Sequence, residues 1–124
     1  MLRYDVHGCT DVTGFGLIGH AREMALASQA TLEIAVDRLQ FLPGAVEYAR
    51  AGAVPGGLRN NREFASCAVE MQFELTREID DLLYDPQTSG GLLISLPESD
   101  AAQFAGGYRI GRVWPRGEKA IRLI

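Results

Sequence analysis

The sequence has little of several features that mark common classes of protein. Lys119 is its only lysine among 12 lysines and arginines, and the net charge is −4. A nucleic-acid surface needs a basic stripe and a P-loop needs its own lysine, so both are disfavoured. No apolar run reaches the ~18 residues that a membrane span requires. We therefore expect neither nucleic acid nor membrane as a partner.

Cysteine is also scarce, because Cys9 and Cys67 are the only two. Two cysteines are too few for a disulfide framework, and their separation lacks the spacing of a metal site. Residues 1–8 are polar and charged, unlike a secretory signal peptide. We expect a cytoplasmic chain with reduced thiols, each packed as a small buried hydrophobe.

What is present fits one globular domain. A length of 124 residues, with 47% hydrophobic and 23% charged residues, is enough for a real core. Strand-like and helix-like stretches alternate, which predicts an α/β (α+β) sandwich, a mixed sheet packed by helices. Strands are predicted at 4–9, 31–36, 92–96, 108–113 and 119–124, with 64–75 favoured as a further strand. Helices are predicted at 15–28, 41–52, 76–84 and 97–105, and loops at 53–61 and 85–91.

Two threonines and two turn residues near the C-terminus complete the local predictions. Thr13 and Thr76 stand where helix N-caps are expected, before 15–28 and 76–84. The strands at 108–113 and 119–124 are predicted to form a last hairpin turned by Pro115 and Gly117, and the strand at 92–96 is predicted to be buried.

A glycine pattern lies in "HGCTDVTGFGLIGH", residues 7–20. Its G-x-G-x-x-G spacing at 14–19 matches the dinucleotide-binding fingerprint, and Asp37 follows "TLEIAV" as the acid that such a fold uses. A first strand buried on both faces should be nearly continuous in apolar residues, however, and the run "GCTDVT" is not. A stand-alone dinucleotide-binding module is therefore the disfavoured alternative.

Asp11 is the unusual residue of that polar run. An unpaired carboxylate buried in a sheet is too costly, so Asp11 must reach water, a donor or a cation. Phosphate is attracted to a helix N-terminus, and a nearby carboxylate would repel it unless a divalent cation lay between them. Asp11 is thus a candidate Mg²⁺ ligand. The alternative is that it caps its own turn through backbone N–H groups.

The remaining polar residues have ordinary interpretations. The loop "DPQTSGG" either faces a ligand or forms an Asp-Pro turn followed by a glycine bulge. We assign no definite role to Gln87, Thr88 and Ser89. His7 and His20 are expected to be solvated or packed, and Asn60 and Asn61 to make turns.

Four runs carry a family resemblance: "CTDVTGFGLIGHAREM", "FLPGAVEYARAGAVPGG", "NREFAS" and "LLYDPQTSGGLLISLPE". In order and spacing they closely resemble the selenophosphate synthetase (selenide, water dikinase) family over nearly the whole chain. Residues 1–124 resemble the C-terminal domain alone, which that family shares with the aminoimidazole ribonucleotide synthetase superfamily. The resemblance implies a mixed-sheet α/β sandwich, with an N-terminal catalytic domain absent here and Met1 opening a fragment.

The resemblance also implies an activity. The intact enzyme makes selenophosphate, AMP and phosphate from ATP, selenide and water, and serves selenocysteine biosynthesis. It implies that Asp11 binds Mg²⁺, and we predict that Thr10, Thr13, Gly14 and Gly16 contribute to the ATP site. The family forms homodimers through its N-terminal domains, which also hold the essential lysine and the reactive cysteine or selenocysteine. No catalytic residue is expected in this chain, which should be inactive alone.

Overall fold

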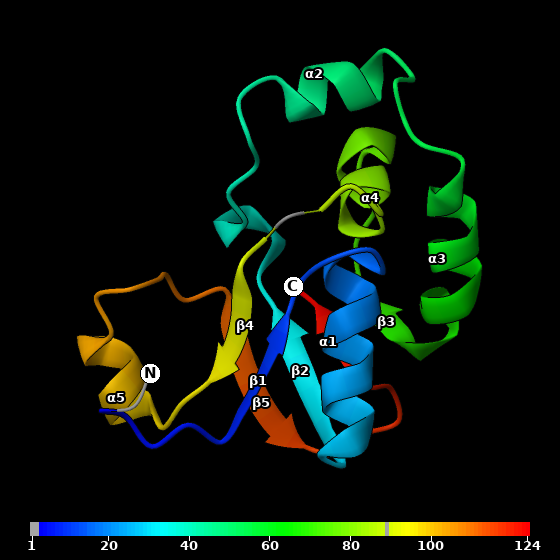
Figure 1. The fold of residues 1–124 in the computed structure, drawn as a ribbon. Coiled ribbons are helices and arrows are strands. Elements are labelled where there is room, and N and C mark those ends of the chain that lie inside the picture. Colours follow the sequence, from blue (N-terminus) through cyan, green and yellow to red (C-terminus); the bar gives the residue numbers. More distant parts are fainter. Residues whose placement is uncertain (1–2, 89) are drawn as a thin grey trace.

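The computed structural model describes residues 3–88 and 90–124 and contains two sheets (Figure 1). A small antiparallel sheet pairs β1 with β4, and a four-stranded sheet has the order β3-β6-β2-β5. In the larger sheet β2, β6 and β3 are parallel and β5 is antiparallel to β2, so the predicted mixed sheet is confirmed. The strands are β1 (Gly8–Asp11), β2 (Ala30–Ile34), β3 (Val69–Met71), β4 (Leu92–Ser95), β5 (Gly111–Pro115) and β6 (Ile121–Leu123).

Four of the helices lie on one side of this arrangement and α5 lies on the other. In Figure 1, α1 runs beside β1 and β2, α2 lies at the top, α3 and α4 lie to the right, and α5 lies at the left near the N-terminus. The helices are α1 (Gly16–Ala27), α2 (Ala45–Arg50), α3 (Gly57–Ala65), α4 (Arg77–Leu83) and α5 (Glu98–Gln103), with 3-10 turns η1 (Val36–Arg38) and η2 (Ser66–Ala68). Among the residues described, no helix is long and apolar enough to cross a membrane.

The core lies between α1 and the larger sheet. Ile18, Ala21 and Ala25 are fully buried on one face of α1, as their helical spacing predicts. They belong to the same cluster as Ile34 of β2 and Ile121 of β6. Each large aliphatic side chain buried in this way contributes about 1.5–3 kcal/mol to folding. The core thus fixes α1, and with it the turn that precedes α1.

The predicted loop at 53–61 is wrong over its second half, because α3 begins at Gly57. Leu58, Asn61 and Ala65 are buried at spacings of three and four residues, which is the pattern of one helical face. The glycines that favoured a loop stand at the start of α3, where they do not interrupt its interior. Asn61 is therefore a buried helix residue and not part of a turn.

Several local predictions about strands and caps are also corrected. The first strand begins at Gly8, and α1 begins at Gly16 after Phe15, so Thr13 is not its N-cap. Thr76 does hold the cap position of α4, although its side chain makes no capping hydrogen bond. β5 and β6 both flank β2 and form no hairpin, because a strand's partner is decided by the whole sheet.

The smaller sheet is more exposed than predicted. Leu92 of β4 is 53% exposed, and Cys9 of β1 is exposed, as is Cys67. The burial of β1 alternates, and the Gly8 side of the strand faces Met24 of α1. Cys9 and Asp11 therefore share the outer face, and the expectation of buried cysteines is wrong.

Candidate functional site

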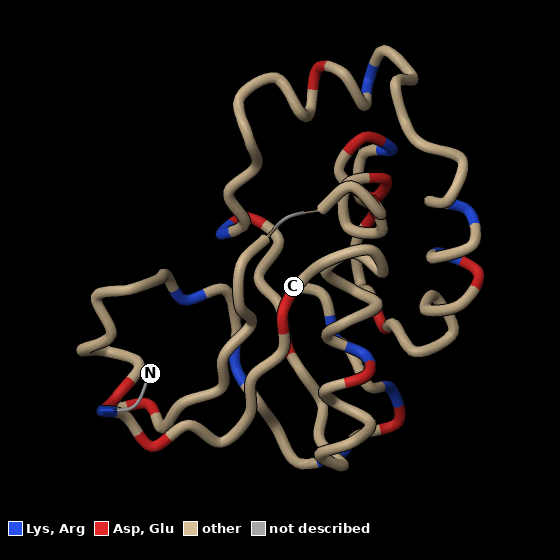
Figure 2. Tube along the Cα trace, in the orientation of Figure 1, with Lys and Arg blue, Asp and Glu red and all other residues tan. Residues whose placement is uncertain are grey.

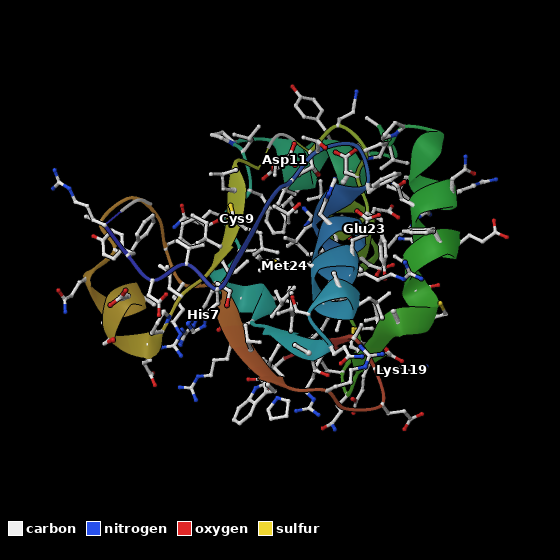
Figure 3. The ribbon with its side chains drawn as sticks, turned by 60° about the horizontal axis from the view of Figure 1, so that its bottom comes forward. His7, Cys9, Asp11, Glu23, Met24 and Lys119 are labelled. Carbon is white, nitrogen blue, oxygen red and sulfur yellow. The ribbon has the colours of Figure 1, made fainter. Side chains whose placement is uncertain are left out.

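Asp11 is the last residue of β1, and its side chain is exposed. Figure 3 labels it where the strand runs into the turn before α1, with Cys9 and His7 further back along the chain. Within residues 3–88 and 90–124 its carboxylate makes no hydrogen bond or ion pair, so it does not cap its own turn. The strand thus presents a carboxylate to solvent beside a helix start.

The turn after Asp11 lies next to the second glycine loop. Val12 is buried, and its N–H donates to the Gly91 carbonyl at 2.9 Å while its carbonyl accepts the Gly90 N–H at 3.1 Å. These two bonds continue the antiparallel pairing of β1 with β4. The structure therefore brings together the two polar loops that the sequence places almost 80 residues apart.

The second loop itself is an Asp-Pro turn. Asp85 accepts the Gln87 N–H through Oδ1 at 3.0 Å, and its carbonyl accepts the Thr88 hydroxyl at 2.7 Å. These are the local bonds typical of Asx and ST turns. Gln87 is exposed, and Ser89 lies outside the described residues.

Two glycines of the first turn have different reasons to be glycine. Gly16 has a φ of +71°, and a Cβ there would stand 2.9 Å from the carbonyl carbon of Tyr84. A Cβ on Gly14 would meet nothing within 4 Å of it. Gly16 is therefore required by the packing of α1 against the end of α4, whereas the space beside Gly14 is open to a molecule from outside.

The same turn contains backbone N–H groups without an acceptor among the described residues. Among the described residues, the N–H groups of Thr13, Gly14 and Phe15 have no acceptor, while the Gly16 N–H donates to the Thr13 carbonyl. The first N–H groups of α1 are free by helix geometry as well. Such donors favour an anion at this end of the helix.

A buried asparagine fixes the turn from below. Asn61 is 8% exposed, and its Nδ2 donates to the carbonyls of Gly14 at 2.9 Å and of Tyr84 at 3.0 Å. The amide thus ties the turn before α1 to the end of α4. This role was not predicted from the sequence, although the spacing of Leu58, Asn61 and Ala65 is a signal that could have revealed it.

Tyr84 is itself held firmly against α3. It is 4% exposed, and the Arg62 guanidinium lies 5.2 Å from its ring centre. Burial raises the pKa of Tyr84 to about 12, with the Asp80 charge adding to the rise and Arg62 opposing it. Figure 2 shows the acidic residues gathered on α4, where Asp80 and Asp81 both accept hydrogen bonds from Arg62.

Thr13 is paired with a second buried polar side chain. Its Oγ1 lies 3.2 Å from Nε2 of His20, a residue of α1 that is 8% exposed. The other ring nitrogen, Nδ1, lies 3.9 Å from Oε2 of Glu23. His20 is thus packed, within the range that the sequence predicted, and it touches the turn that holds the candidate site residues.

The carboxylate chemistry here is that of a partial metal site. The part of the chain that the structure describes contains no group of three His, Cys, Asp or Glu side chains able to hold a metal ion. Mg²⁺ is commonly bound by one or two carboxylates, with water and phosphate oxygens completing its six ligands. Asp11 therefore fits Mg²⁺ as one ligand of a set that residues 3–88 and 90–124 do not complete.

The dinucleotide-binding alternative does not fit the topology. β1 and β2, which flank α1, belong to different sheets, so they are not neighbouring parallel strands of one β-α-β unit. Asp37 lies in η1, beyond the end of β2. The G-x-G-x-x-G spacing is therefore not part of a Rossmann fold here.

Comparisons with known proteins show the family to which the chain belongs. The sequence pattern of the family described as "AIR synthase related protein, C-terminal domain" matches residues 1–123. The chain is 42% identical over 128 residues to "Selenide, water dikinase" of Clostridium botulinum (strain Eklund 17B / Type B), covering 97% of this chain and 37% of that protein. It is 40% identical over 131 residues to the protein of the same name from Clostridioides difficile (strain 630), covering 98% of this chain and 38% of that protein.

A solved structure shares the fold. Thiamine monophosphate kinase from Aquifex aeolicus superposes with a TM-score of 0.54 at 18% identity, over 98% of this chain and 32% of the kinase chain. The chain thus spans 37% of the length of the first curated relative and matches its C-terminal part. It belongs to the family of AIR synthase related proteins, as a C-terminal domain similar to that of the selenide, water dikinases.

Proposed function

We propose that the chain is the C-terminal half of a selenophosphate synthetase, an enzyme that makes selenophosphate, AMP and phosphate from ATP, selenide and water. In this proposal Asp11 is a Mg²⁺ ligand, and the turn at 12–16 forms part of an ATP site between two domains. The observation that carries the proposal is the exposed Asp11 carboxylate, which has no protein partner among the described residues and adjoins a turn with free N–H groups.

Elementary electrostatics explains why these features belong together. A carboxylate beside a phosphate chain is repulsive, and a divalent cation between them turns that repulsion into attraction. When bound, Mg²⁺ supplies charge neutralisation of the phosphates. The chain's own share is to place one carboxylate at the end of β1 and to leave backbone N–H groups of the adjoining turn free of acceptors.

The other predicted residues contribute unequally. Gly14 leaves room for the phosphates to approach the backbone, and Thr13 is an exposed residue of the same turn, with its hydroxyl in contact with His20. Thr10 donates to the Asp11 carbonyl at 3.3 Å and so supports the strand end that carries the ligand. Gly16 acts through the fold, because its close approach to Tyr84 sets the start of α1.

The remaining parts of the site belong to an N-terminal domain in this proposal. One carboxylate and one turn are too few to hold a triphosphate with its metal ions, and the relatives are longer than this chain by more than half of their own length. We place the essential lysine, the nucleophile, the further metal ligands and the homodimer contacts there. The whole enzyme is proposed to be cytoplasmic.

To test this proposal, a chimera is made in which this chain follows the N-terminal part of the Clostridium botulinum relative. Its release of AMP from ATP is measured in the presence of selenide and Mg²⁺. The chimera is expected to release AMP, and the 124-residue chain alone is expected to release none. Asp11→Asn in the chimera should abolish AMP release while the far-UV spectrum is kept, and Asp37→Asn, at another exposed carboxylate, should not. Equal Mg²⁺ dependence in the Asp11→Asn variant and the parent would contradict the assignment.

A further inference from the structure

His20 is the one histidine of the described residues that is buried, and it faces the proposed site. It lies in the second turn of α1, where the core holds its backbone in place. Its Nε2 meets the Thr13 hydroxyl at 3.2 Å, and the centre of its ring lies 5.4 Å from that of Phe15. The imidazole therefore has a fixed position and one short polar contact.

That contact lies in the middle of the ligand-facing turn. Thr13 is exposed, and it stands between Asp11 at the strand end and Gly14, beside which there is open space. An exposed threonine in a turn samples several χ1 rotamers unless a partner selects one. The bond to His20 selects the rotamer that holds the hydroxyl against α1.

The second nitrogen of the ring indicates the direction of this bond. Nδ1 lies 3.9 Å from the Glu23 carboxylate, which favours a proton on Nδ1 and leaves Nε2 as an acceptor. In that tautomer the Thr13 hydroxyl donates to Nε2, and its oxygen keeps lone pairs that can accept a bond from a ligand. Glu23 is itself half-exposed, so it biases the ring without burying a charge.

We propose that His20 is a positioning residue that fixes the Thr13 side chain for binding of a Mg²⁺-nucleotide at the turn before α1. This inference rests on the proposed function, since the nucleotide is the ligand assigned there. Beyond that function, His20 is a buried side chain that does not touch the nucleotide, and it sets the geometry of Thr13, which does. The two residues are seven positions apart in the run "TDVTGFGLIGH".

The test uses nuclear magnetic resonance on the 124-residue chain, with Mg²⁺-ATP as the probe. The three-bond couplings of Thr13 report its χ1 rotamer, and the titration gives the dissociation constant. We expect one rotamer in the parent and averaged couplings in His20→Phe, which keeps a ring of similar size. The Mg²⁺-ATP affinity should fall roughly threefold to tenfold, the usual worth of one hydrogen bond.

A double-mutant cycle separates positioning from a general loss of structure. Thr13→Val should weaken binding as much as His20→Phe, and the double variant should be no weaker than either one. Thr13→Ser keeps the hydroxyl and should bind Mg²⁺-ATP with the affinity of the parent. His7→Phe replaces an exposed histidine and should change neither the Thr13 couplings nor the Mg²⁺-ATP affinity. Should His20→Phe destabilise the fold, His20→Gln offers a second variant that keeps a polar group near the hydroxyl.

The outcomes are distinct from those of the proposed function. Three results would overturn the positioning role. They are unchanged Thr13 couplings in His20→Phe, an unchanged Mg²⁺-ATP affinity in His20→Phe, and a double variant whose affinity loss is the product of the two single losses. If the parent chain itself failed to respond to Mg²⁺-ATP, both the nucleotide role of the pair and the proposed function would fall. Averaged couplings with a matched loss of affinity would support the inference.

Discussion

At the scale of single residues, Asn61 is the clearest case of a side chain that shapes the candidate site from within the core. Its amide gives one hydrogen bond to each of two carbonyls, those of Gly14 and Tyr84, in a place that water hardly reaches. A buried carbonyl without a donor is costly. The turn before α1 and the end of α4 are thus held by one nitrogen.

Asn61→Asp tests that role, because it replaces the donor with a negative oxygen of the same shape. We expect the free energy of unfolding to fall by about 2–4 kcal/mol, since two carbonyls lose their donor and a carboxylate is buried beside them. Urea denaturation at neutral pH measures the change. Asn60→Asp is the matched control on the exposed side of α3 and should change stability by less than about 0.5 kcal/mol. Equal losses in the two variants would contradict the buried contact.

Tyr84 gives a prediction about pH. Its pKa of about 12 in the folded chain exceeds the ordinary value of 10.0 that it regains on unfolding, because burial disfavours the phenolate. The folded state therefore keeps the proton to a higher pH, so the contribution of Tyr84 to stability is constant below pH 10 and falls as the pH rises from 10 to about 12. The full loss amounts to roughly 2–3 kcal/mol.

The measurement for this prediction is urea denaturation at a series of alkaline pH values. The Tyr84→Phe variant should lack this part of the fall in the free energy of unfolding at alkaline pH. Tyr48→Phe and Tyr108→Phe, at exposed tyrosines, should show the same fall as the parent. An alkaline slope of equal size in the parent and in Tyr84→Phe would show that the phenol is not the responsible group.

At the scale of elements, the link between β1 and α1 does two different jobs with two glycines. Gly16 adopts a left-handed φ against the backbone of Tyr84, and Gly14 has open space where a side chain would stand. The first supports the fold, and the second leaves access for a ligand.

Alanine substitutions separate these jobs. Gly16→Ala should lower the free energy of unfolding by more than about 2 kcal/mol, from the strained φ and the contact with Tyr84 together. Gly14→Ala should leave stability nearly unchanged and weaken Mg²⁺-ATP binding, because the new methyl group stands in the open space. Thermal denaturation and calorimetric titration measure the two effects. A stable Gly16→Ala chain, or a Gly14→Ala chain that binds like the parent, would contradict this division.

The elements that the sequence predicted well are those with a local cause. α1, α4 and α5 follow from helical spacing and turn residues, and they are confirmed within a few positions. α3 was missed because the glycines and asparagines of 53–61 outweigh a short one-face pattern, Leu58, Asn61 and Ala65, in which the middle residue is polar. The flanking of β2 by β5 and β6 is a property of the whole sheet, which neighbouring residues do not encode.

In the candidate site, too, features with a local cause were predicted from the sequence, and features that depend on distant segments were not. Asp11 stood out because a lone carboxylate in a strand needs an explanation, and the structure places it in the open at the strand end. The adjacency of the turn to Gly90 and Gly91 depends on the β1–β4 pairing, which joins distant segments. His20 and Asn61 were given ordinary interpretations, because their hydrogen-bond partners lie in another turn or at the end of another helix. Helical spacing can place Asn61 on a buried face, but it does not identify the carbonyls to which Asn61 donates.

At the scale of the whole molecule, our proposal gives the chain one side of a site. β1 ends at one end of the small sheet and leads into the turn before α1 (Figure 1), and the Asp11 side chain at that end is exposed. The four-stranded sheet packs against α1 and so holds this turn in place. A chain of this kind should bind a nucleotide weakly and only with the cation, because the cation supplies the attraction that one turn lacks.

Isothermal titration calorimetry of the 124-residue chain with ATP, with and without Mg²⁺, tests whether Asp11 binds ATP through a magnesium ion. We expect weak ATP binding that needs Mg²⁺. This binding should be lost in Asp11→Asn and kept in the control Asp37→Asn. It also predicts no binding of NAD in the absence of metal. Binding of ATP that is equally strong without Mg²⁺, or that survives Asp11→Asn unchanged, would contradict the account.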